Sequence, residues 1–160
     1  MALIERLEKT TDATHWCGQI PMNYVYTAGR AGELFFKTLK EKGEFVGARC
    51  NDCGIVYLPP RIHCERCFSN IEGNNVKVPN KGTVHTFTVC HENYEEKAKE
   101  APSIVAMIRM EGAAGGLVHW IRKCEPEECT IGMEVKAVLK PEKNREGSIL
   151  DIDYFEPIKK

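Results

Sequence analysis

The chain has no long apolar run and no excess of charge of either sign. Its 160 residues include 22 Lys and Arg against 23 Asp and Glu, which gives a formal net charge of −1. No stretch reaches the roughly 18 apolar residues that a membrane-spanning helix needs. The N-terminal segment 1–6 lacks the apolar core of a secretory signal. We therefore expect a cytoplasmic protein that makes no contact with a membrane.

Cationic residues are not concentrated in either half of the chain. Residues 1–78 contain ten Lys and Arg against nine Asp and Glu, and residues 79–160 contain twelve against fourteen. Nucleic-acid-binding domains usually have a clear cationic excess, because the neutralisation of phosphates supplies much of their affinity. The charge distribution therefore disfavours nucleic acid as a partner.

Cysteine, in contrast, is plentiful, and four of the eight cysteines form two matched pairs. Two residues separate Cys50 from Cys53, two separate Cys64 from Cys67, and ten lie between the pairs. Two such hooks can place four thiolates around one tetrahedral Zn²⁺ at sulfur distances of about 2.3 Å. A reducing cytoplasm favours metal binding over disulfides. We therefore predict a zinc ribbon with these four ligands, with iron or no metal as the alternatives.

A zinc ion held by four cysteines has no open coordination position. Catalytic zinc sites keep a position for water or substrate, whereas structural sites are closed. The motif therefore predicts structural zinc and disfavours a stand-alone zinc enzyme, and His63 beside the second pair is expected to be a flanking side chain. Cys90 and His91 are adjacent on a predicted strand, so their side chains point to opposite faces and do not form a nucleophile–base pair. We predict no catalytic residue on this chain.

The rest of the pattern predicts one helix and several strands. Residues 30–42 have apolar side chains at spacings of three and four, which predicts an amphipathic helix that ends at Gly43. This helix either covers the core or docks on a partner subunit. Two paired strands are expected at 45–49 and 55–58. Five further strands and one helical turn are expected at 82–91, 103–110, 117–122, 133–140 and 149–155, and at 126–129.

Five antiparallel strands with short connections favour a small Greek-key barrel of the OB type. We therefore predict a mainly β protein in three parts: an N-terminal arm and amphipathic helix (1–43), a four-cysteine zinc ribbon (44–75) and a five-stranded OB-fold barrel (76–160). Alternation in the first barrel strand predicts one face with Val84, Thr86 and Thr88. The arm, residues 1–29, is interpreted either as an anchor to another surface or as packed on its own domain. Its aromatic side chains leave both interpretations open.

This order of parts, together with several short segments, resembles a known protein family. Residues 47–61, which include the first cysteine pair and end in Pro-Pro-Arg, are similar to a signature of the acyl-CoA-associated zinc-ribbon/OB-fold family. The segments 82–89, 131–135 and 154–157 are similar to it as well. Many ribbons share the cysteine pairs, so the Pro-Pro-Arg and Gly-Thr-Val segments make the resemblance specific. It covers about residues 30–158.

The resemblance implies a non-catalytic accessory subunit that forms a hetero-oligomer with a thiolase-fold enzyme. Such a subunit organises its partner for CoA-dependent cleavage or formation of carbon–carbon bonds and helps to hold the CoA thioester. Arg61 is then a candidate contact to the CoA phosphates, although no phosphate-binding glycine motif is present. The alternative function is a zinc-ribbon/OB-fold protein that binds single-stranded nucleic acid by stacking bases on aromatic side chains.

Overall fold

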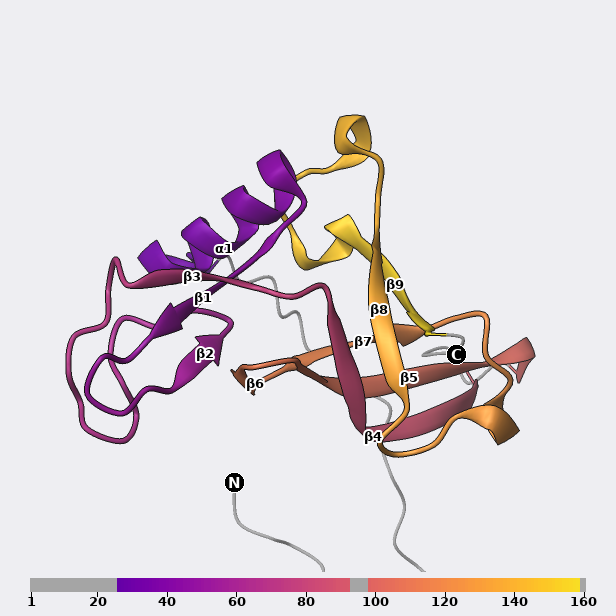
Figure 1. The fold of residues 1–160 in the computed structure, drawn as a ribbon. Coiled ribbons are helices and arrows are strands. Elements are labelled where there is room, and N and C mark those ends of the chain that lie inside the picture. The colour runs from indigo at the N-terminus through magenta and orange to yellow at the C-terminus, as the bar shows by residue number, and fades with distance from the viewer. Residues whose placement is uncertain (1–25, 93–97, 159–160) are drawn as a thin grey trace, which may run out of the picture.

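The computed structural model describes residues 26–92 and 98–158 (Figure 1). Most of the predicted N-terminal arm, residues 1–25, lies outside these ranges. None of the helices within them combines the length and the apolar character needed to cross a bilayer. The elements are α1 (Gly29–Lys42), β1 (Phe45–Arg49), β2 (Val56–Leu58), β3 (Asn75–Val78), β4 (Lys81–Glu92), β5 (Ala98–Met110), β6 (Ala114–Gly115), β7 (Leu117–Ile121), β8 (Glu134–Leu139) and β9 (Ile152–Pro157), with 3-10 turns η2 (Pro126–Glu128), η3 (Glu142–Asn144) and η4 (Ile149–Asp151).

The strands form a ribbon sheet and a closed barrel, which lie side by side in Figure 1. The ribbon sheet has the strand order β3-β1-β2-β6, and the barrel has the order β4-β5-β7-β9-β8. The prediction of a mainly β protein with one helix, a ribbon and a five-stranded barrel is confirmed. The helical turn expected after the third barrel strand is also present, as η2. The domain boundaries at 43/44 and 75/76 stay a prediction.

One pair of barrel strands contradicts the expectation of five antiparallel strands. β7 and β9 run parallel at Ile121 and Phe155, whereas the other four neighbouring pairs are antiparallel. The reason is geometric, because strand direction reverses at every antiparallel neighbour. An odd number of strands cannot alternate all the way round a ring. A closed barrel of five strands must therefore contain a parallel pair.

The predicted face of β4 was also wrong, because the strand contains a bulge. Val84 pairs with Ile108, and Thr86 pairs with the adjacent Met107, so His85 is an extra residue. A bulge shifts the alternation of side chains by one position. Val84 is accordingly buried, whereas Thr86 and Thr88 are exposed. A period-two pattern assumes unbroken pairing and cannot reveal this shift.

The last strand starts later than predicted, because residues 149–151 form the turn η4. The carboxylate of Asp151 accepts hydrogen bonds from the backbone N–H groups of Glu146 and Gly147, each at 2.8 Å. Asp151 is only 1% exposed, so these bonds satisfy a buried carboxylate and define the turn. The apolar character of Ile149 suits a strand equally well, which explains the error.

Helix α1 covers the core, which agrees with the first of its two predicted roles. Phe35 and Leu39 are one turn apart and fully buried. They belong to the same apolar cluster as Phe45 of β1 and Phe155 of the barrel. Gly43 then ends the helix in the left-handed conformation and donates its N–H to the carbonyl of Leu39 at 3.0 Å. The helix, the inner part of the ribbon and the barrel therefore share one packed interior.

A short parallel pairing joins the ribbon to the barrel. β6 lies in the connection between β5 and β7 and pairs with β2, at Tyr57 with Ala114 and at Leu58 with Gly115. Gly115 has a φ of +91°, and a Cβ atom there would lie 2.5 Å from the carbonyl oxygen of Leu58. Only glycine allows the two backbones to approach this closely. A connection of the barrel thus supplies the edge strand of the ribbon sheet.

Candidate metal centre

The two cysteine hooks of the ribbon have the same backbone hydrogen bonds. In the first hook the carbonyl of Cys50 accepts from the N–H of Gly54 at 2.8 Å, and the N–H of Cys50 donates to the carbonyl of Ile55 at 2.8 Å. In the second hook the carbonyl of Cys64 accepts from the N–H of Phe68 at 2.9 Å, and the N–H of Cys64 donates to the carbonyl of Ser69 at 3.0 Å. The chain therefore makes the same tight turn twice.

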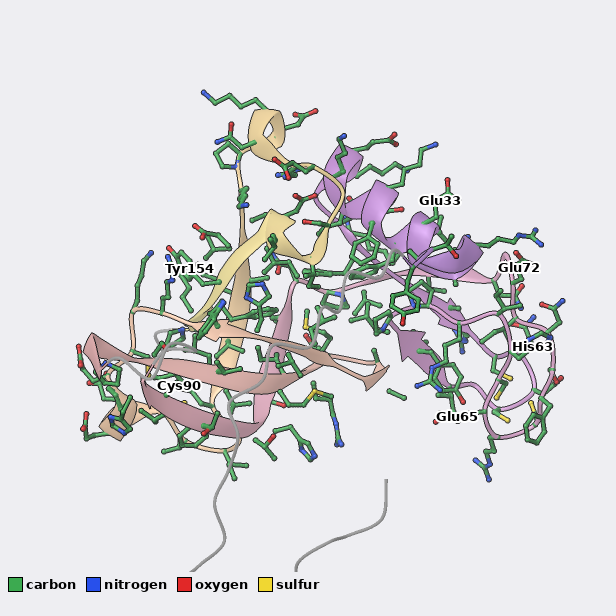
Figure 2. The ribbon with its side chains drawn as sticks, turned by 180° about the vertical axis from the view of Figure 1, so that it is seen from behind. Glu33, His63, Glu65, Glu72, Cys90 and Tyr154 are labelled. Carbon is green, nitrogen blue, oxygen red and sulfur yellow. The ribbon has the colours of Figure 1, made fainter. Side chains whose placement is uncertain are left out.

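These turns bring the four predicted ligands together. One sulfur atom from each cysteine lies within 4.8 Å of the other three. The Sγ atoms of Cys50 and Cys67 are 3.5 Å apart, and those of Cys53 and Cys64 are 4.0 Å apart. A tetrahedral zinc site with bonds of about 2.3 Å has sulfur–sulfur separations of about 3.8 Å, which these distances match. In Figure 2 the yellow sulfur atoms gather beside the labelled His63, which is exposed and does not belong to the cluster.

Other side chains of the ribbon contact the sulfur atoms. The hydroxyl of Tyr57, itself buried, lies 3.3 Å from the sulfur of the buried Cys64. The hydroxyl of Ser69 lies 3.1 Å from the sulfur of the exposed Cys67. Neither contact is among those predicted from the sequence. A tyrosine on the returning strand of a ribbon is a usable signal, because that strand passes the second hook, whereas the contact of Ser69 depends on turn geometry alone.

Without a cation, four thiols this close together cannot all lose their protons. Hydrogen bonding from Tyr57 lowers the pKa of Cys64 to about 6, since the hydroxyl stabilises the thiolate. The hydrogen bond with Cys67, followed by burial, raises the pKa of Cys53 to about 12. A divalent cation removes this conflict, because it binds all four sulfurs as thiolates. The donor set and its spacing thus fit a zinc ion.

Arg61 lies outside the sulfur cluster, on the segment between β2 and the second hook. Its guanidinium is 5.0 Å from the centre of the Tyr57 ring and forms an ion pair with Glu65. It borders an open cavity of about 400 Å³ between α1 and the ribbon, where Arg30 and Glu72 form an ion pair at 2.8 Å. Its contact with CoA phosphates stays a prediction.

The remaining cysteines of the described residues are free thiols that lie on the barrel side of the molecule. Cys90 is half-buried on β4, and Figure 2 places it far from the ribbon. Cys124 and Cys129 flank the turn η2 and are half-buried and buried, respectively. Burial raises the pKa of both of these thiols, Cys129 to about 11. They are therefore protonated at neutral pH and behave as ordinary interior thiols.

The fold and this cluster together define a zinc-ribbon/OB-fold protein. Residues 39–72 match the model of the ChsH2 rubredoxin-like zinc ribbon domain, and residues 75–140 match that of the ChsH2 C-terminal OB-fold domain. A DUF35 domain-containing scaffold protein of Methanocaldococcus jannaschii is 34% identical over 125 residues, which cover 77% of this chain and 88% of that protein. The chain therefore belongs to the family of DUF35 domain-containing scaffold proteins.

Further relatives agree with this assignment. A DUF35 domain-containing scaffold protein of Methanothermobacter thermautotrophicus is 28% identical over 124 residues, 76% of this chain and 92% of that protein. The crystal structure of a DUF35-family protein from Sulfolobus solfataricus is 30% identical, with a TM-score of 0.60 over 69% of this chain and 78% of that one. A chain of the Ltp2-ChsH2(DUF35) aldolase is 24% identical, with a TM-score of 0.59 over 81% of this chain and 95% of that one, and this likeness shows the fold.

Proposed function

We propose that this chain is the non-catalytic scaffold subunit of an acyl-CoA-processing complex whose catalytic subunit has the thiolase fold. The single observation that carries the proposal is the cluster of four cysteine sulfurs, which supplies a complete tetrahedral set of ligands. Such a site holds the shape of the ribbon and leaves no position for substrate or activated water. Membership of a family of scaffold proteins supports the same assignment.

Structural Zn²⁺ is the ion that we assign to this cluster. All four ligands are thiolates, which suit zinc, and the two hooks converge from segments that have little apolar core of their own. Binding of the ion is then coupled to folding of the ribbon, with an apparent free energy on the order of 10 kcal/mol. The role of the metal is to stabilise a surface that the partner recognises.

The outer face of the barrel supports a protein as the partner. Two rows of neighbouring side chains cross β4, β5 and β7 there, and we call them the barrel patch: Thr88, Val105 and Trp120 in one row, and Thr86, Met107 and Val118 in the other. Val118 is 62% exposed and Trp120 is 39% exposed. Uncharged aliphatic and aromatic side chains of this kind are typical of the centre of a protein interface. A nucleic-acid surface would instead need cations and several stacking rings.

The reaction that we propose for the complex is CoA-dependent cleavage or formation of a carbon–carbon bond. Its particular form is thiolysis of benzoylsuccinyl-CoA in anaerobic toluene degradation, because the chain resembles the small subunit of benzoylsuccinyl-CoA thiolase. One structural neighbour, the Ltp2-ChsH2(DUF35) aldolase, is itself named for two components. Arg61, at the mouth of the cavity beside α1, is the residue we assign to the CoA phosphates.

Co-purification with an identified partner tests this proposal. The full chain is captured from native extract, the thiolase-fold protein that accompanies it is identified by mass spectrometry, and both are then produced together. We expect no thiolytic turnover from the chain alone, turnover from the complex, and heat on titration of the complex with acyl-CoA. Cys50→Ala is expected to abolish assembly, whereas the matched variant Cys90→Ala keeps it. Turnover by the isolated chain, or no thiolase-fold protein in the captured material, would overturn the proposal.

A further inference from the structure

The two cysteine hooks differ at one equivalent position, and no contact among residues 26–92 and 98–158 explains the difference. Gly54 and Phe68 each follow the second cysteine of a hook, and each donates its N–H to the carbonyl of the first. Both have a positive φ, 71° for Gly54 and 60° for Phe68. Glycine adopts this left-handed conformation without strain, whereas a bulky side chain adopts it only at an energetic cost. The second hook thus has a strained residue where the first has an unstrained one.

Within the described part of the chain, packing of the Phe68 ring does not compensate for this cost. The ring is 78% exposed and belongs to neither of the two apolar clusters. An apolar ring in water forgoes the favourable free energy that burial would provide. Glycine at position 68, as at position 54, would make the folded chain more stable, because it would remove the backbone strain. Strained residues that the fold itself does not require are concentrated at functional sites.

The surroundings of Phe68 are polar and exposed. They comprise Glu65, Arg66 and Asn70 along the chain, and Asp52 of the first hook, whose carboxylate accepts a hydrogen bond from the hydroxyl of Ser69 next to Phe68. A single projecting aromatic ring with a polar rim is the arrangement of an energetic anchor in a protein–protein interface.

We propose that Phe68 inserts into an apolar pocket of the catalytic subunit and anchors the ribbon there. The inference rests on the proposed function, since the catalytic subunit is the partner. A second copy of this chain is the poorer occupant. The described residues around Phe68 are otherwise polar, and a self-complementary dimer needs about 800 Å² of well-packed surface from each copy. A ring that projects from a small tip suits a pocket on a larger, different protein.

The experiment separates binding from stability. Phe68→Gly introduces the residue that already occupies the equivalent position of the first hook, so it relieves the backbone strain while it removes the ring. The matched control is Ile131→Ala, which removes a 69% exposed apolar side chain from the barrel side of the molecule. For each full-length variant we would measure the zinc content, the Tm and, by titration calorimetry, the Kd for the thiolase-fold subunit.

We expect Phe68→Gly to keep one zinc ion per chain and an unchanged or higher Tm, while the Kd rises by about 30-fold or more, the equivalent of about 2 kcal/mol. Ile131→Ala is expected to leave the Kd unchanged. If the unmodified chain does not bind a thiolase-fold subunit at all, the proposed function fails. If it binds and Phe68→Gly binds equally well, the anchor alone is wrong. Loss of zinc from Phe68→Gly would also overturn the proposal that Phe68 is an anchor. So would the finding, by ultracentrifugation, that the unmodified chain self-associates and Phe68→Gly does not.

Discussion

Among the described residues, the barrel, helix α1 and the inner part of the ribbon share one apolar cluster of eighteen buried side chains, whereas the outer ribbon has a cluster of five. Two of those five are the proposed ligands Cys50 and Cys64. An apolar core of this size cannot offset the conformational entropy of the ordered segment, and small modules use a metal ion to make up the difference. We therefore expect the ribbon to depend on its proposed metal ligands for stability, and the barrel to depend on side-chain packing.

Loss of the metal is expected to have the largest effect on the difference in stability between the ribbon and the barrel. Removal of the ion, or the substitution Cys64→Ala, is expected to unfold the outer ribbon, because a coupling free energy on the order of 10 kcal/mol is lost. Hydrogen exchange followed by mass spectrometry would show loss of protection at β1 and β2 but retained protection at β5 and β7. The substitution Cys90→Ala serves as the thiol control. Equal loss of protection in the barrel would mean that the two regions do not differ as described.

Removal of a large side chain from the barrel core is expected to have the opposite effect: it destabilises the barrel and leaves the metal site intact. Phe155 is fully buried and lies where β9 meets both β7 and β8. Phe155→Ala creates a cavity and should lower the free energy of unfolding by about 3–5 kcal/mol. Urea denaturation measures the loss, and elemental analysis should still find one zinc ion per chain under native conditions. Release of zinc by this variant without denaturant would contradict the independence of the ribbon site.

The pairing of β2 with β6 connects the ribbon to the barrel. Weakening this pairing tests how far the stability of one region depends on the other. Gly115→Ala places a methyl group against the carbonyl oxygen of Leu58, whereas Gly112→Ala has a similar positive φ of +73° but no atom within 4 Å. Both variants carry the strain of an L-residue at positive φ, about 1–2 kcal/mol. Only Gly115→Ala should lose more stability than this, together with exchange protection at β2. Equal effects would mean that the contact does not couple ribbon and barrel.

A smaller effect is expected from His119, which points into the barrel. Its side chain is 6% exposed, and its Nδ1 atom has no hydrogen-bond partner among the residues that the structure describes. Burial lowers the pKa of His119 below the usual 6.5. The unfolded chain therefore binds the proton more readily, so this group stabilises the fold above pH 6.5 and destabilises it as the pH falls below that value.

His119→Leu is accordingly expected to remove part of the pH dependence of stability below pH 6.5. The slope that one proton can contribute is at most about 1.4 kcal/mol per pH unit. Urea titrations of both proteins between pH 5 and 7.5, with zinc content verified at each pH, would measure the difference. Identical slopes would mean that the folded barrel does not lower the pKa of His119.

Prediction from the sequence succeeded where a signal was local. The spacing of the cysteines predicted the hooks, and the three-and-four spacing of residues such as Phe35 and Leu39 predicted the helix and its buried face. The predictions were wrong where the local structure depends on which distant residues pair with a segment. The bulge at His85 reversed the faces of β4, and the carboxylate of Asp151 formed a turn from residues that resemble a strand.

The sequence by itself determined which four cysteines gather, the position of helix α1 and the number of barrel strands, because covalent spacing and side-chain periodicity act over a few residues. Only the tertiary structure decided the parallel pair of β7 and β9, the insertion of β6 into the ribbon sheet and the contact of Tyr57 with Cys64. These features depend on ring closure and on approaches between distant segments. Such approaches follow from packing the whole chain, and no local pattern encodes them.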